Sequence, residues 1–132
     1  MSAAGVSEGG CFCGAIRYRA VERPIGVTHC HCTQCRRHGG GAFQTWVSFE
    51  GGVTFTKGAP RVYRSSDRAE RGHCPTCGTP LIFRYVDQAP RISVSVGSLD
   101  TPETVVATRH YWTSETLPWL RLDDYLPRRR RQ

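Results

Sequence analysis

Seven cysteines, gathered into three tight groups, constrain this chain more than any other feature of its sequence. The groups are Cys11-x-Cys13, Cys30-x-Cys32-x-x-Cys35 and Cys74-x-x-Cys77. Thiolates held one to three residues apart can converge on one metal ion without help from distant parts of a fold. An odd number of cysteines cannot pair completely into disulfides. We therefore expect metal-bearing loops.

The composition fits a single small domain with a thin apolar core. The chain has 132 residues, of which Leu, Ile, Val and Phe make up about a fifth, near the lower limit for a packed core. No apolar run approaches the ~18 residues of a membrane span, and residues 1–10 lack the basic and apolar stretches of a secretory signal. We therefore expect a cytoplasmic protein without a membrane segment, whose thiols stay reduced.

The charge balance is basic, with 18 Lys and Arg against 11 Asp and Glu and a formal net charge of +7. Four of the arginines form the run Arg128 to Arg131. Such a run can contact nucleic acid or an acidic surface, but we expect a solvated, mobile end and no nucleic-acid partner, and leave a homodimer open. The predicted organisation is a flexible N-terminus (1–8), a zinc-binding domain (9–126) and a basic tail (127–132).

Short runs of alternating and β-branched residues predict a mainly β fold of small antiparallel sheets, stapled by zinc and carrying metal-bearing loops. Gly51 and Gly52 predict a tight turn that joins 43–49 to 53–57 as a hairpin. The expected strands cover residues 15–20, 43–49, 53–57, 61–64, 81–86, 91–96 and 108–112.

Helical signals are weak. One or two turns are expected over 33–38, ended by the glycines at 39–41, whose freedom at positive φ suits a helix stop. A second, single turn is expected with Asp100 as its cap and Pro102 near its first position. Three tryptophans are expected to pack in the core or at its rim, namely Trp46, Trp112 and Trp119.

The segment Cys74-Pro-Thr-Cys77-Gly78 is the sharpest local signal for a metal site. Proline after the first cysteine stiffens the turn, and glycine after the second lets the backbone swing back, so both sulfurs point the same way. The alternative is a redox dithiol, but redox motifs of the thioredoxin type place proline directly before the second cysteine. The order of residues favours zinc.

A closed structural zinc site needs four ligands, and this turn supplies two. Cys11 and Cys13 are the natural partners, because they also lie in a loop just ahead of a predicted strand. Binding of structural zinc contributes roughly 10 kcal/mol or more in small peptides. A four-thiolate site would therefore offset the thin core.

Cys30, Cys32 and Cys35 are then left as a group of three. Three protein ligands and one open position are typical of a catalytic zinc. The open position can accept water or the sulfur of an incoming thiol, whose pKa the zinc would lower. Alternatively, His29 or His38 closes the site as a fourth ligand, whereas His31, between two cysteines, is expected to point away.

Two arginines follow this group directly. Arg36 and Arg37 are candidates for binding the substrate, because guanidinium groups bind carboxylates through paired hydrogen bonds. The alternative, that at least one of them simply faces water, stays open.

Several motifs, taken together, resemble the glutathione-dependent formaldehyde-activating enzyme family, also called the centromere protein V family. The resemblance covers residues 9–120. It is carried, in order, by Gly10-Cys-x-Cys-Gly14, Cys30-His-Cys-x-x-Cys-Arg36, Cys74-x-x-Cys-Gly-Thr-Pro-Leu81, Val96-Gly-Ser-Leu-Asp100, and His110 followed by Pro118-Trp119.

The resemblance implies a β-tent fold with two zinc ions per chain. By position, Cys11, Cys13, Cys74 and Cys77 correspond to the family's structural four-thiolate site. Cys30, Cys32 and Cys35 correspond to its three-thiolate catalytic site. The implied activity is that of a carbon–sulfur lyase, in which glutathione condenses with formaldehyde to S-hydroxymethylglutathione.

Two functions therefore stay open at the level of sequence. The first is zinc-dependent carbon–sulfur chemistry on glutathione or another small thiol with formaldehyde or a related aldehyde. The second is a non-catalytic zinc module that binds a partner or nucleic acid through its basic surface.

Overall fold

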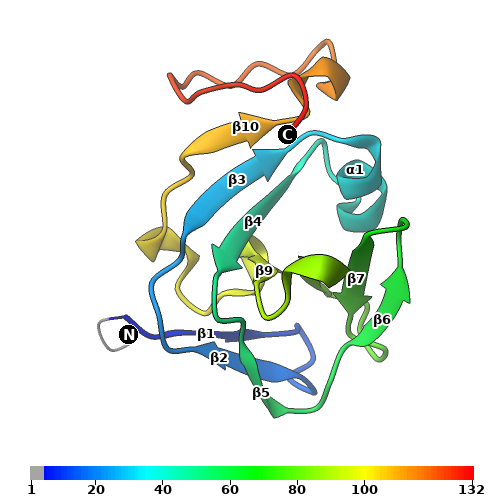
Figure 1. Cartoon of the computed structure of the whole chain (residues 1–132), viewed down its shortest axis with the longest axis vertical. Helices are drawn as coiled ribbons and strands as arrows, with labels where there is room; N and C mark the ends of the chain where they lie inside the picture. The colour runs from blue at the N-terminus through cyan, green and yellow to red at the C-terminus, as the bar shows by residue number, and fades with distance from the viewer. Residues whose placement is uncertain (1–4) are drawn as a thin grey trace.

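The computed structural model describes residues 5–132, and these residues form a mainly β fold with one α-helix, as expected (Figure 1). Two sheets carry the fold. The smaller sheet has the strand order β1 (Ser7–Gly10), β2 (Arg17–Ala20), β5 (Thr54–Lys57). The larger sheet has the order β10 (Arg109–Tyr111), β3 (Gly26–Cys30), β4 (Gln44–Phe49), β9 (Ile92–Ser95), β8 (Pro80–Tyr85), β7 (Ala69–His73), β6 (Arg61–Arg64).

The strand pairs are antiparallel except one, because β10 runs parallel to β3. The predicted antiparallel sheets are confirmed, with one parallel pair added at this edge. The parallel pairing places Tyr111 opposite Cys30 and Arg109 opposite Thr28. This pairing brings residues 109–111 beside the cysteine group that begins at Cys30.

The core lies where the two sheets meet. Tyr18 is fully buried, and its hydroxyl shares a 2.7 Å hydrogen bond with the Ser98 hydroxyl, so the buried polar atom is satisfied. The other large, fully buried side chains of this apolar cluster come from both sheets and their connections: Ile16, Val47, Phe49, Leu81, Ile82, Val94. These few contacts hold the strands that carry the cysteine loops.

Most strand predictions are confirmed to within a few residues, but the predicted hairpin is wrong. Strand β5 pairs with β2 and not with β4, because both edges of β4 are already occupied by β3 and β9. Strands β1, β3 and β7 were not expected. Their sequences, Ser-Glu-Gly-Gly, Gly-Val-Thr-His-Cys and Ala-Glu-Arg-Gly-His, carry little apolar alternation.

Helix α1 (Thr33–Gly39) confirms the predicted helix and its glycine stop. Gly40 adopts φ of 79° after the last turn, and its N–H donates to the Arg36 carbonyl, as in a left-handed helix cap. At the other end, Cys32 is the N-cap residue, and its sulfur accepts a hydrogen bond from the Cys35 N–H. The helix start thus turns cysteines inward.

Four short 3-10 helices complete the chain: η1 (Val86–Gln88), η2 (Val96–Ser98), η3 (Pro102–Thr104), η4 (Thr113–Glu115). Pro102 opens η3 as expected, but the predicted cap is wrong. Thr101 occupies the cap position, and no side chain caps the turn. Asp100 instead accepts a 2.9 Å hydrogen bond from Arg17, within an ion pair to strand β2.

The C-terminal arginine segment is exposed to solvent, as expected, but hydrogen bonds hold its backbone to the fold. Its carbonyls accept hydrogen bonds from the N–H groups of Trp112, Thr113 and Ser114, and the Pro127 carbonyl accepts one from His110. At the other end, Ser7 and Glu8 belong to β1, while residues 1–4 of the expected flexible N-terminus lie outside the described residues. Among residues 5–132, no helix is long and apolar enough to cross a membrane.

Candidate metal centres and cavity

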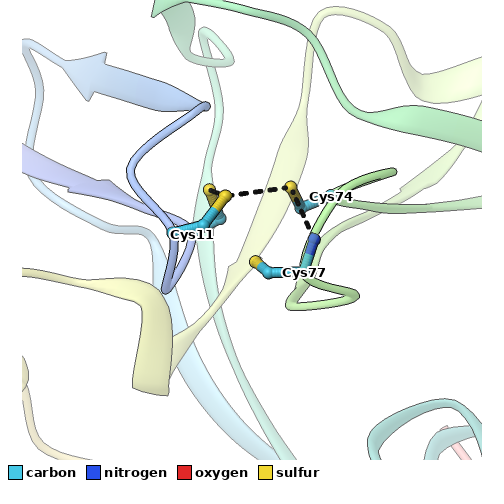
Figure 2. A group of neighbouring side chains, drawn as sticks. Cys11, Cys74 and Cys77 are labelled. Atoms are coloured by element: carbon cyan, nitrogen blue, oxygen red, sulfur yellow. Dashed lines mark hydrogen bonds between the residues drawn. The ribbon is translucent and has the colours of Figure 1, made fainter.

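Four thiols converge from two loops that are far apart in the sequence. Cys11 and Cys13 lie between β1 and β2, and Cys74 and Cys77 lie between β7 and β8. All four sulfurs are within 4.8 Å of one another, with 3.6 Å between those of Cys11 and Cys13 and 3.8 Å between those of Cys13 and Cys74. Figure 2 shows Cys11, Cys74 and Cys77 directed toward a common centre. The structure therefore brings together the four cysteines that ligand counting paired.

Backbone amides surround this four-cysteine cluster. The Ile16 N–H donates to the Cys11 sulfur at 3.2 Å, and the Thr76 and Cys77 N–H groups donate to the Cys74 sulfur at 3.4 Å. Hydrogen bonding to Thr79 lowers the pKa of Cys77 to about 5. These contacts favour thiolates, the form that binds metal.

Three further thiols converge at the junction of β3 and α1. Cys30 ends β3, Cys32 caps α1 and Cys35 lies in the first turn, and their sulfurs are within 4.8 Å of one another. No fourth His, Cys, Asp or Glu from residues 5–132 joins this three-cysteine cluster. The described part of the chain therefore brings three sulfurs together here and no fourth ligand.

The three histidines near this cluster have other partners. His29 Nδ1 lies 2.6 Å from the Thr45 hydroxyl, and His38 Nδ1 lies 3.2 Å from the Gln44 amide nitrogen. His31 points away from the sulfurs, as expected, toward His110. The alternative of a site closed by His29 or His38 therefore finds no support in the geometry.

The protonation of the three thiols is interdependent. Hydrogen bonds with Cys30 and Cys35 lower the pKa of Cys32. Hydrogen bonds with Cys32 and Cys35 have the opposite effect on Cys30 and raise its pKa. Three thiolates this close would repel one another, so a bound cation would favour the fully deprotonated form. Thiolates are the preferred ligands of zinc in sites of four or three sulfurs, so the donor sets of both clusters fit this metal.

Side chains, and not backbone amides, contact the innermost sulfur of the three-cysteine cluster. The Trp46 indole N–H donates to the Cys35 sulfur at 3.4 Å. The two terminal nitrogens of Arg71 donate to the same sulfur at 3.5 and 3.6 Å. From its sequence, Trp46 was expected only in the core or at its rim, and nothing in the local sequence singled out Arg71.

A cavity of about 460 Å³ opens onto the three-cysteine cluster. All three of its cysteines line the wall, whereas none of the four-cysteine cluster does. Apolar and polar groups share the rest of the lining, including Trp46, Phe83, Tyr85, Tyr111 and Trp112. Of the two clusters, the three-cysteine cluster is therefore the one that faces this cavity.

The arginines of this cavity are not those suggested by the sequence. Neither Arg36 nor Arg37 lines it: Arg36 donates to the Glu115 carbonyl, and Arg37 is exposed. The lining instead includes four arginines from distant strands and loops, namely Arg71, Arg84, Arg91 and Arg109. Their gathering depends on sheet order, which the local sequence around the cysteines does not reveal.

A buried chain of hydrogen bonds connects the three-cysteine loop to the C-terminal segment. His31 Nε2 lies 2.8 Å from His110 Nδ1, and His110 Nε2 lies 3.0 Å from the Asp124 carboxylate. Burial, followed by the proximity of His110, lowers the pKa of His31 to about 4, so its imidazole is neutral at pH 7. These hydrogen bonds fix the three-cysteine loop against residues 124–128, where Arg128 also pairs with Asp124.

A mainly β fold with one cluster of four thiols and a second cluster of three thiols that faces a cavity defines a class of small cysteine-rich proteins. The family model described as "Glutathione-dependent formaldehyde-activating enzyme" matches residues 6–115. The chain belongs to this family.

Individual relatives agree with this assignment. The chain is 32% identical over 80 residues to an uncharacterised lyase of Schizosaccharomyces pombe. It is 31% identical over 83 residues to a Halomonas elongata protein whose name provisionally assigns it as a glutathione-dependent formaldehyde-activating enzyme. These matches cover 61% and 56% of this chain but only 58% and 53% of the two relatives.

A crystal structure of a Rhodobacter sphaeroides protein shares the fold. The two structures have a TM-score of 0.55 at 18% sequence identity, over 92% of this chain and 98% of the other. At this identity the likeness concerns the fold alone.

Proposed function

We propose that this protein is a carbon–sulfur lyase of the S-(hydroxymethyl)glutathione synthase type, with two zinc ions per chain. It would condense a small thiol such as glutathione with formaldehyde or a related aldehyde. The observation that carries the proposal is the cavity that opens onto three cysteines, to which residues 5–132 add no fourth ligand. The family and the two relatives support a lyase.

The two clusters would hold the metal in different roles. Cys11, Cys13, Cys74 and Cys77 would form a closed structural site, and Cys30, Cys32 and Cys35 an open one. Zinc bound at the open site lowers the pKa of a thiol and polarises nearby oxygen atoms. In the reaction the substrate thiol loses its proton, its sulfur forms a bond to the carbonyl carbon, and the carbonyl oxygen gains a proton. The reverse reaction breaks the same carbon–sulfur bond.

Arg109 is the cavity residue best suited to bind a carboxylate of the thiol substrate. Arg84 and Arg91 already pair with Glu70 and Glu50, whereas no carboxylate from residues 5–132 lies within ion-pair distance of Arg109. Among the residues that the structure describes, its buried Nε has no partner, and its side chain makes one hydrogen bond, to the Tyr111 hydroxyl at 3.1 Å. A free guanidinium in a cavity wall favours an acidic thiol over a neutral one.

Gly26 makes room for this arginine. A Cβ atom at Gly26 would collide with the Arg109 guanidinium. Gly26 lies four residues before Cys30 on β3, or about 13 Å at the usual rise of a strand. The arrangement therefore suits a peptide-sized thiol, whose sulfur and carboxylate lie well apart.

Metal analysis combined with a glutathione titration tests the proposal. We expect two zinc ions per chain, one of which changes its coordination when glutathione is added, and condensation with ¹³C-formaldehyde visible by NMR. Arg109→Ala should raise KM for glutathione about tenfold or more, whereas the matched control Arg91→Ala should not. One tightly held zinc ion that does not respond to glutathione would overturn the proposal.

The arginine run does not favour the alternative of a partner-binding module. Its carbonyls are engaged by residues 112–114, so the backbone of the segment is part of the fold and not a free arm. Replacement of Arg129, Arg130 and Arg131 by glutamine keeps this backbone and separates the two functions, because a binding module would lose its partner while thiol chemistry at the cysteines would not depend on these charges.

A further inference from the structure

Arg71 is a buried charge without a carboxylate partner. Its side chain comes from the middle of β7 and is only 3% exposed. Within residues 5–132, no carboxylate lies within 4.0 Å of its guanidinium. Besides the Cys35 sulfur, it reaches only the Gln44 side-chain oxygen at 3.5 Å and the Phe83 ring at 4.9 Å. Its Nε has no partner.

Such a charge needs compensation. Taking an ion out of water costs several kcal/mol unless an opposite charge or strong hydrogen bonds replace the solvent. Gln44 and Phe83 are neutral, so the negative charge must come from the cysteines. Three thiolates around one divalent cation carry one net negative charge, which equals the charge of one guanidinium with the opposite sign.

The four-cysteine cluster provides the contrast. Four thiolates around a divalent cation carry two net negative charges, yet the contacts found around these sulfurs are backbone amides and the Thr79 hydroxyl. No arginine among the described residues donates to them. A guanidinium is therefore not a general requirement of thiolate sites in this protein but belongs to the one that faces the cavity.

We propose that Arg71 is a positioning residue that supplies the counter-charge of the three-cysteine site and thereby favours an anionic over a neutral fourth ligand. The inference rests on the proposed function in one respect, since it requires a metal ion at that site. A neutral site would bind a thiolate against less repulsion than a negatively charged one. Arg71 therefore selects the charge of the ligand, whereas Arg109 would recognise its far end.

The test compares an anionic and a neutral ligand at the loaded site. Protein carrying cobalt(II) in place of zinc is titrated with thiocyanate and, separately, with imidazole, and binding is followed by visible absorption. The readout is the ratio of the two affinities. Arg71→Met should lower the thiocyanate-to-imidazole ratio at least about tenfold, because charges a few ångströms apart interact strongly away from bulk water. Arg71→Lys, which keeps the positive charge, should leave the ratio within about threefold of the wild-type value.

A structural role for Arg71 would give a different result. It would weaken thiocyanate and imidazole alike in Arg71→Met and leave the ratio unchanged, which would overturn the inference. Arg71→Gln, which keeps hydrogen-bond donors without the charge, provides the same measurement if Arg71→Met does not fold. Arg84→Met is the matched control, because Arg84 lines the same cavity but already pairs with Glu70.

The same experiment separates this inference from the proposed function. If only one cobalt ion binds per chain and neither probe changes the spectrum, the open site does not exist and both proposals fail. If two cobalt ions bind and both probes respond, but the ratio is insensitive to Arg71, only the role of Arg71 is overturned.

Discussion

The two cysteine clusters contain the same ligand type but differ in origin, in their neighbours and in access. The four-cysteine cluster joins loops about sixty residues apart, and backbone amides contact its sulfurs. The three-cysteine cluster comes from six consecutive residues, and Trp46 and Arg71 contact its innermost sulfur beside a cavity. Long-range ligands suit a site that holds strands together, whereas local ligands leave one side of a site free.

The largest expected effect tests the structural half of this comparison. Cys77→Ser should unfold the chain or remove on the order of 5 kcal/mol or more, because zinc binding at such sites contributes directly to folding and small domains have only about 5–15 kcal/mol in total. Thermal unfolding followed by circular dichroism measures the loss. Thr76→Ser, in the same turn, is the control. A melting temperature unchanged in Cys77→Ser would contradict the structural role.

The second prediction tests the open cluster. Cys32→Ser should lower the metal content from two ions per chain to one and reduce condensation activity at least about a hundredfold, since zinc activation of the thiol would be lost. The fold should survive, because serine is a favourable N-cap and can replace the cap at the start of α1. Metal analysis and a melting curve on the same sample check both parts. Unfolding comparable to that of Cys77→Ser would show that the two clusters do not differ in role.

The third prediction concerns the hydrogen-bonded chain behind the open cluster. Asp124→Asn should cost about 1–3 kcal/mol, the usual effect of removing a charged partner from a buried hydrogen bond, here that of His110. Urea unfolding gives the magnitude, and hydrogen exchange should show the largest loss of protection in residues 110–131. Asp123→Asn, at the exposed neighbouring position, should have little effect. Equal hydrogen-exchange protection in both variants would show that these hydrogen bonds do not hold the C-terminal segment in place.

The smallest expected effect lies beside the four-cysteine loop, where Arg17 pairs with Asp100. The hydrogen bond from Arg17 lowers the pKa of Asp100 below its ordinary value. The stabilisation is therefore present above the unfolded-state pKa of about 3.9 and is lost as the pH falls through the lowered pKa. Because both groups are more than a third exposed, Asp100→Asn should cost less than about 1 kcal/mol at pH 7. Carboxyl NMR titration checks the direction, and a midpoint above 3.9 would contradict it.

The sequence was most informative about structures that form between residues close together along the chain. The spacing of the cysteines, the proline and glycine of the Cys74–Cys77 turn and the glycine stop of α1 are local, and each predicted its structure correctly. Ligand counting also paired Cys11 and Cys13 with this turn.

Long-range pairing explains what the sequence could not provide. The expected hairpin failed because β5 pairs with β2, a choice set by competition among edges and not by its turn. Arg71 lies in a strand without apolar alternation, and its distance from Cys35 in the sequence hides their contact. Arg36 and Arg37 were chosen for their closeness along the chain, whereas the cavity is lined by arginines that the sheets bring together.

Strand β7 has a consequence for a protein short of zinc. Its five residues carry Arg71 to one cluster and lead directly into Cys74 of the other. Displacement of the Cys74 turn would therefore shift the guanidinium away from Cys35, although the three thiols of the open cluster remain intact. Under the proposed function, partial loss of zinc should therefore give a mixture of active and inactive molecules, because β7 connects the four-cysteine cluster to the side chain that contacts Cys35.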